Sequence, residues 1–183
     1  MEKIISSSLN NKEILKARAI KLAKETVSEK EKSKELDVVE FKIARETYGI
    51  ELKFIRTIHP LKNLTYIPGA PDFIKGVINL RGEIISVVDL KKFFDLPDQE
   101  LTNLSQVIIL SSDTMEFGIL ADEILDVMQI PEASIQPSLP TLTGIRLAYL
   151  KGVTGDSEVI LDGDKLLADE KMLIYIETGG VKD

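Results

Sequence analysis

The sequence contains no cysteine and no tryptophan, and its single histidine is His59. Without cysteine, the chain cannot form disulfides, zinc–thiolate sites, iron–sulfur clusters or a catalytic thiol. One histidine is also too few for a metal site built from several histidines. Aromatic residues make up only 5% of the chain. Isoleucine, leucine and valine must therefore fill most of the core.

Long apolar runs are absent as well. No stretch approaches the ~18 residues of a transmembrane helix, and the N-terminus lacks the apolar segment of a secretory signal. We therefore expect a soluble, cytoplasmic protein with no direct membrane insertion. The chain has 183 residues, of which 44% are apolar. It is long enough to bury a core without a disulfide or a metal.

Charge is distributed unevenly along the chain. Residues 1–36 hold 9 Lys and Arg against 6 Asp and Glu, a net charge of +3. Residues 37–183 hold 14 against 24, a net charge of −10. An acidic body disfavours binding to a phosphate backbone, which needs a basic face. The charge therefore predicts no nucleic-acid partner.

The first 35 residues form a charged arm. Residues 11–35 contain no proline, glycine or aromatic residue, and good helix formers dominate. A narrow apolar stripe predicts a helix over about 11–28, followed by a charged linker to about residue 35. The pattern leaves open a frayed arm, a helix that docks on a partner and a helix on a membrane surface. The last is disfavoured because its stripe lacks a large side chain.

From Leu36 onward, short β-rich runs alternate with turns, which indicates a sandwich or barrel. Three blocks recur in the same order, at offsets of 69, 76 and 73 residues. They are Tyr48–Ile50 and Phe117–Ile119, Phe73–Val77 and Tyr149–Val153, and Gly82–Asp89 and Gly155–Asp162. The repeat predicts two small β-barrel lobes, about 36–100 and 101–178, followed by a tail over 179–183. The repeated Asp89 and Asp162 are expected to cap a short helix in each lobe.

Catalytic patterns are few. Asp162-Gly163-Asp164 lacks the ligand spacing of a calcium loop. The glycines match no phosphate-binding motif. A small hydrolase that uses Asp89 and Asp162 is an alternative, although their matching places in the repeat favour structural caps. The sequence thus predicts a binding module with no catalytic residue, metal or cofactor.

One connection between two predicted strands stands out, namely Asn79-Leu80-Arg81-Gly82. Gly82 permits the positive φ angle that a tight connection needs. Arg81 would then point outward, where its guanidinium group can bind a carboxylate of a partner. The alternative is an ordinary exposed turn arginine.

The block from Gly76 to Leu90, with the pattern G-V-x-N-L-R-G-x-I-x-x-V-V-D-L, resembles the CheW family of chemotaxis coupling proteins. Further matches are Tyr48–Ile50, the Ile67-Pro68 loop and Tyr149–Gly152, so the resemblance covers about residues 36–178. It implies two SH3-like five-stranded barrels and no enzymatic activity. The 1–35 arm lies outside the core of the family.

The resemblance also implies two partners, the cytoplasmic tip of chemoreceptors and the regulatory domain of the histidine kinase CheA. The protein would be a scaffold recruited to receptor arrays at the membrane. A chemosensory-like pathway that does not control flagella remains an alternative. The receptor would lie in an apolar groove near the Gly76–Gly82 connection, and Arg81 stands at a functionally sensitive position of the family. Members of the family often carry an acidic residue at the position of Thr57, so this chain differs from them there. The residues expected in the groove are Leu52, Ile55 and Ile58.

Overall fold

The computed structural model describes residues 34–96, 105–137 and 145–173. Most of the expected arm, residues 1–33, and the expected tail lie outside this part of the chain. The strands are β1 (Glu35–Ile43), β2 (Glu46–Glu51), β3 (Ile55–Pro60), β4 (Ile74–Leu80), β5 (Glu83–Val88), β6 (Gln106–Ser111), β7 (Glu116–Ala121), β8 (Glu123–Pro131), β9 (Leu150–Val153) and β10 (Val159–Leu161). The α-helices are α2 (Leu90–Phe93) and α3 (Gly163–Ala168). Short 3-10 helices are η1 (Leu52–Phe54), η2 (Glu132–Ser134), η3 (Ile145–Tyr149) and η4 (Glu170–Met172).

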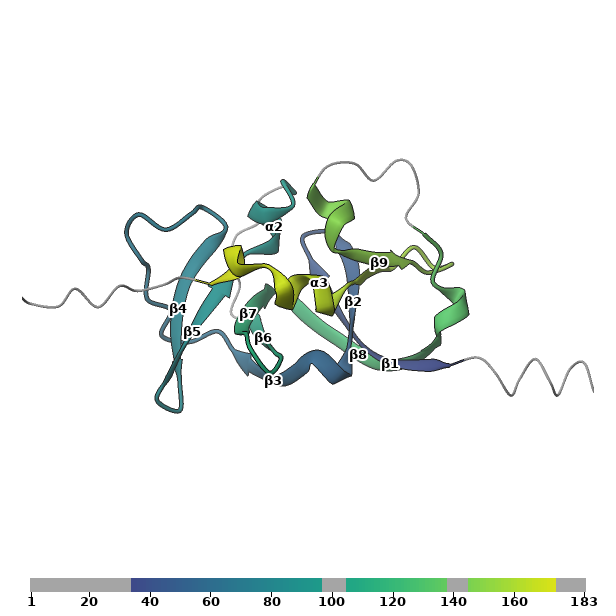
Figure 1. Ribbon diagram of the computed structural model, residues 1–183, viewed down its shortest axis with the longest axis horizontal. Coiled ribbons are helices and arrows are strands. Elements are labelled where there is room, and N and C mark those ends of the chain that lie inside the picture. Colours follow the sequence, from purple (N-terminus) through teal and green to yellow (C-terminus); the bar gives the residue numbers. More distant parts are fainter. Residues whose placement is uncertain (1–33, 97–104, 138–144, 174–183) are drawn as a thin grey trace, which may run out of the picture.

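The strands form two five-stranded sheets, which confirms the mainly-β prediction. One sheet, here sheet A, has the order β8-β1-β2-β10-β9, and the other, sheet B, has the order β3-β6-β7-β5-β4. Figure 1 shows sheet B on the left and sheet A on the right, with α2 and α3 between them. Within the described ranges, no helix is long and apolar enough to cross a membrane.

The two halves of the chain exchange strands, which the division at about residue 100 did not foresee. Sheet A takes β1 and β2 from the first half and β8, β9 and β10 from the second. Sheet B takes β6 and β7 from the second half and β3, β4 and β5 from the first. The expected lobes 36–100 and 101–178 therefore do not correspond to the two sheets.

The length of the β7–β8 connection accounts for the part of this exchange that involves β8. Only Asp122 separates β7 from β8, and the three residues of η1 separate β2 from β3. The commonest tight hairpin needs a two-residue loop. A strand that follows after one residue cannot fold back on its predecessor, so β8 continues into sheet A.

The sequence repeat appears as matching geometry in the two sheets. β2 pairs in parallel with β10 at Tyr48 and Gly49, and β7 pairs in parallel with β5 at Gly118 and Ile119. An isolated bridge also reaches the edge strand of each sheet, from Thr65 to Val77 on β4 and from Gln136 to Val153 on β9. The repeat therefore predicted equivalent strands correctly, although it could not predict which sheet each strand enters.

Four β-bulges follow the same symmetry. The extra residue is Arg56 in β3 and Leu125 in β8, at the offset of 69. It is Lys75 in β4 and Lys151 in β9, at the offset of 76. A bulge redirects the side chain of the extra residue away from the regular alternation of the strand. Three of these four bulge positions carry a cationic side chain.

Both repeated aspartates cap the helices predicted for them. The Asp89 carboxylate accepts a hydrogen bond from the Lys91 N–H at 3.0 Å, and Asp162 accepts one from the Lys165 N–H at 3.1 Å. Each cap satisfies an N–H group that the first helical turn leaves without a partner. Asp89 is almost fully buried. This placement favours the structural role over the hydrolase alternative.

The largest apolar cluster lies between the sheets and draws residues from both. Rings from the two halves of the chain meet in it: Phe93 packs edge-on against Phe73 and Tyr149, with centroids 5.0 and 5.1 Å apart. Smaller clusters lie within sheet B and within sheet A. Because the main core is shared, the two sheets are expected to fold as one unit.

Candidate protein-interaction site

The β4–β5 turn presents Arg81 at one end of the molecule. Arg81 and Gly82 form its two central residues, with φ angles of 56° and 94°. Positive φ at both positions is the requirement of a type I′ hairpin turn. The Asn79 side chain accepts a hydrogen bond from the Gly82 N–H at 2.9 Å and stabilises the turn. Arg81 therefore adopts a backbone conformation that costs a non-glycine residue about 1–2 kcal/mol.

Beside this turn lies a hollow of about 420 Å³. Its walls are the outer side of β3 and the end of β4, lined by Arg56, Thr57, His59, Asn79, Leu80 and Arg81. The hollow concentrates cationic and hydrogen-bonding groups in a body whose net charge is negative. It is suited to an anionic group of a partner.

Arg56 is already bound within the chain. Its Nη1 lies 2.7 Å from Glu116 on β7 and 2.7 Å from Glu83 at the start of β5. Hydrogen bonds to Glu116 and Glu83 raise the pKa of Arg56 above its ordinary value. In contrast, no carboxylate within the described ranges pairs with Arg81.

The expected groove residues do not share one environment. Leu52 in η1 is 41% exposed and lines a second hollow, of about 510 Å³, with Lys53, Glu51 and the start of β1. Ile55 and Ile58 on β3 are partly buried and pack against the main core. Of the three, Leu52 is thus the most accessible to a partner.

Gly76 has a structural explanation. It is buried with φ at 147°, and a Cβ atom there would lie 2.3 Å from the Thr65 carbonyl oxygen. Thr65 approaches this closely because it exchanges two hydrogen bonds of 2.8 Å with Val77. By contrast, a Cβ at Gly82 would meet nothing within 4 Å. Gly82 is therefore required only by the conformation of the turn.

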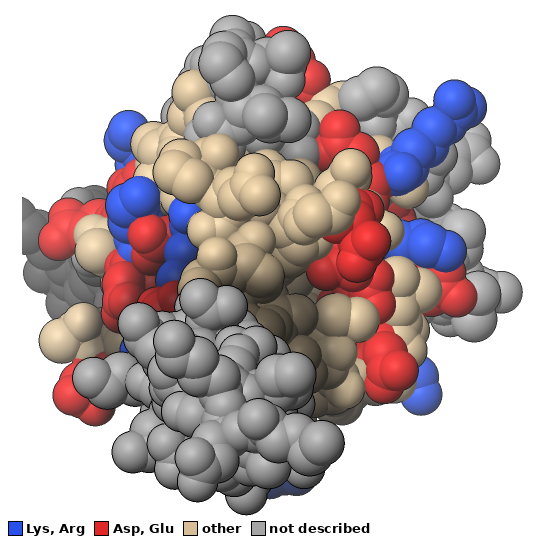
Figure 2. Space-filling view, turned by 90° about the vertical axis from the view of Figure 1, so that its right-hand side faces the viewer, with Lys and Arg blue, Asp and Glu red and all other residues tan. Residues whose placement is uncertain are grey.

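Sequence reasoning missed two exposed apolar residues on β8. Leu125 is 37% exposed and Val127 is 55% exposed. Val127 lies opposite Val39 on β1, which lies opposite Ile50 on β2, so these three form one row across sheet A. The internal repeat could have indicated Val127, because it corresponds to the expected groove residue Ile58 at the offset of 69. Figure 2 shows, at the sheet A end of the molecule, an area without charged side chains beside acidic groups.

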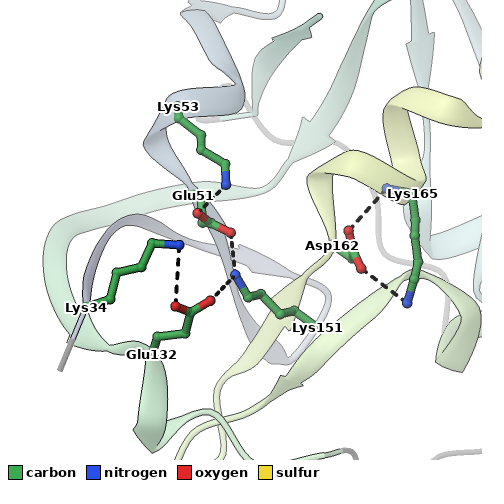
Figure 3. A network of polar contacts seen from close by, with 7 residues as sticks. All are labelled: Lys34, Glu51, Lys53, Glu132, Lys151, Asp162 and Lys165. Carbon is green, nitrogen blue, oxygen red and sulfur yellow. Dashed lines mark hydrogen bonds and ion pairs between the residues drawn. The ribbon is translucent and has the colours of Figure 1, made fainter. Parts of the chain in front are cut away.

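An ion-pair network holds the crossing from β2 to η1 (Figure 3). The nearly buried Glu51 carboxylate lies 2.7 Å from Lys151 Nζ and 2.8 Å from Lys53 Nζ. Glu132 bridges Lys151 and Lys34 at 3.4 Å each. Burial alone would raise the pKa of Glu51, but the hydrogen bonds from Lys151 and Lys53 outweigh it and lower the pKa. The bulge residue Lys151 thus stabilises the point where the chain changes sheets.

Two sheets around a shared core, an arginine on an exposed turn and exposed apolar residues are features that suit a protein-binding module. Among the described residues, no group of three or more His, Cys, Asp or Glu side chains could hold a metal ion. Residues 37–171 match the CheW-like domain, so the chain belongs to the CheW-like family of chemotaxis coupling adaptors.

Individual relatives agree with this membership. The chemotaxis protein CheW of Klebsiella aerogenes is 31% identical over 161 residues, which cover 86% of this chain and 93% of that protein. The chemotaxis protein CheW of Bacillus subtilis is 30% identical over 146 residues, 80% of this chain and 86% of the relative. The crystal structure of the scaffolding protein TtCheW from Thermoanaerobacter tengcongensis superimposes with a TM-score of 0.63 at 34% identity, covering 70% of this chain and 84% of that one.

Proposed function

We propose that this chain is a non-enzymatic adaptor that couples the cytoplasmic tip of chemoreceptors to the regulatory domain of the histidine kinase CheA. It would act in receptor arrays at the membrane. The observation that carries the proposal is Arg81, held outward on a type I′ turn with no carboxylate of its own among the described residues.

The apolar contact is proposed to use residues on both sides of the β2–β3 crossing. Leu52 is exposed in η1, and Ile55 and Ile58 continue along β3 at the edge of the core. The exposed Leu52, together with the accessible parts of Ile55 and Ile58, suits the apolar face of a helix. The receptor tip is assigned to this surface, and Gly76 and Gly82 act by positioning the turn beside it.

The test is a reconstituted phosphorylation assay with the receptor and the kinase of the same organism. Arg81→Glu should keep the wild-type melting temperature but weaken binding by about tenfold or more, because a charge-assisted hydrogen bond of about 1.5–3 kcal/mol is replaced by repulsion. Arg45→Glu is the matched control, since Arg45 is also exposed and lies in the β1–β2 turn. The proposal is wrong if Arg81→Glu supports receptor control of the kinase as well as Arg45→Glu does.

A further inference from the structure

The second hollow, of about 510 Å³, lies where the chain enters the described fold. It is lined by residues 34–37, at the start of β1, and by residues 51–53, at the crossing from β2 to η1. Leu52, which is 41% exposed, supplies accessible apolar surface in it. One wall of the hollow is therefore the segment that directly follows residues 1–33 of the arm.

The start of the described chain is held in place beside this hollow. The Lys34 carbonyl oxygen accepts a hydrogen bond of 2.8 Å from the Glu132 N–H, and Lys34 Nζ lies 3.4 Å from the Glu132 carboxylate. Figure 3 shows this pair in the same network as Glu51 and Lys53. The arm therefore starts from a fixed point at the edge of the hollow, and its five linker residues, 29–33, can span up to about 17 Å from there.

Two carboxylates of the hollow keep their negative charge. Glu35 and Asp37 are both exposed, and neither forms an ion pair with a lysine or arginine of the described ranges. The Asp37 carboxylate accepts a hydrogen bond of 2.9 Å from the Gln129 amide, which carries no charge. Exposed apolar surface beside negative charge suits an amphipathic helix with cationic residues.

The sequence of the arm has the complementary pattern. Residues 1–33 hold 8 Lys and Arg against 5 Asp and Glu, a net charge of +3. In the helix predicted over about 11–28, Leu15 and Leu22 are seven residues apart and therefore share one face. Arg18 lies three residues after Leu15 and four before Leu22, so it borders the same face. This face of the predicted helix combines two leucines with a cation.

We propose that the arm docks its Leu15–Leu22 face on the hollow of its own chain and covers Leu52. Such docking needs little intrinsic affinity, because a short linker holds the arm at an effective concentration in the millimolar range. The inference goes beyond the proposed adaptor function. Where that function holds, the arm competes with the receptor tip, because Leu52 belongs to both contacts. The arm is then an inhibitor built into the chain, and the receptor must displace it.

The absence of cysteine permits a direct test of docking. Lys24→Cys introduces the single thiol of the chain, and a nitroxide attached to it broadens the NMR signals of nearby amides. We expect the Leu52 amide signal to be broadened in this chain. Adding Leu22→Asp should restore the signal. Ile20→Asp is the matched control, since it makes the same change on the opposite face of the predicted helix and should leave the broadening in place.

A mixing experiment shows which chain supplies the arm. Nitroxide-labelled chains without isotope are mixed with isotope-labelled chains without nitroxide. Docking within one chain predicts no broadening of the Leu52 amide in this mixture. Broadening there would overturn the proposal, because a second copy would then supply the arm. An unbroadened Leu52 amide in the nitroxide-labelled chain, or equal recovery of the signal in Leu22→Asp and Ile20→Asp, would overturn it as well.

Competition with the receptor is measured separately, by calorimetry with a soluble receptor-tip fragment. Leu22→Asp should bind the fragment about three- to tenfold more tightly than wild type, which corresponds to an arm docked for about two-thirds to nine-tenths of the time. Ile20→Asp should bind it as wild type does. Equal affinity of Leu22→Asp and wild type would overturn the competition at Leu52. If no variant binds the fragment, the proposed function fails, whereas the nitroxide experiment still decides whether the arm docks.

Discussion

Replacing Glu51 with glutamine tests the ion-pair network at the crossing from β2 to η1. The Glu51 side chain is only 7% exposed and lies within 2.8 Å of both Lys53 and Lys151. Glutamine keeps the shape but loses the charge, and its amide group faces an ammonium group. A hydrogen bond to a charged group contributes about 1.5–3 kcal/mol. We expect a loss of this size, because Lys151 retains Glu132 and Lys53 can be rehydrated.

The assay is thermal unfolding at neutral pH, followed by circular dichroism. A loss of 1.5–3 kcal/mol corresponds to a fall in melting temperature of roughly 3–12 °C for a domain of this size. Glu132→Gln is the matched control, since Glu132 shares Lys151 but its side chain is 39% exposed. Exposed ion pairs contribute little to stability, so this variant should melt close to wild type.

The pH dependence makes the test sharper. The pKa of Glu51 is lowered from its ordinary value of 4.5 in the folded protein. Its contribution to stability is therefore present above pH 4.5 and is lost as the pH falls through the folded pKa. The difference between wild type and Glu51→Gln should shrink below pH 4.5. A difference that is the same at pH 7 and pH 3.5, or one no larger than that of Glu132→Gln, would refute the reasoning.

Two further predictions concern the glycines and Tyr149. Gly76→Ala should destabilise the fold by about 2–4 kcal/mol because its Cβ would meet the Thr65 carbonyl oxygen at 2.3 Å. Gly82→Ala should cost only about 1–2 kcal/mol, from strain in the turn. Equal melting temperatures of the two variants would contradict the close approach of Thr65 to Gly76. Burial and the hydrogen bond to Asp169 raise the pKa of Tyr149 from 10.0 to about 12. Stability should therefore be lost as the pH rises from 10 towards 12. Chemical denaturation of Tyr149→Phe should not show this decline. A parallel decline in wild type and variant would contradict the assignment to Tyr149.

Local chemistry was readable from the sequence because it depends on a few neighbouring residues. An aspartate before a short apolar helix predicts a cap, and Asp89 and Asp162 are caps. A glycine between two β-rich runs predicts a turn with positive φ, and Gly82 has it. Features of this kind require only hydrogen bonds and dihedral preferences within about four residues.

Pairing between distant strands was not readable in the same way. Strands of similar length and apolar pattern can pair in several combinations. The alternation of side chains shows which face is buried, but it does not determine which two strands pair. The bulges at Arg56 and Leu125 also shift side chains between faces without any glycine to mark them. For this reason the sequence did not mark the exposed Val127, and it could not show that Ile55 and Ile58 are partly buried against the core.

The exchange of strands between the two halves has a consequence for how such a chain can be divided. Neither half contains all five strands of either sheet. Two fragments separated after α2 would each hold strands of both sheets, and neither could complete a sheet alone. Their folding would then be bimolecular and dependent on concentration. The same geometry describes two identical half-length chains that swap strands around a twofold axis, an arrangement that gene duplication and fusion would convert into one polypeptide.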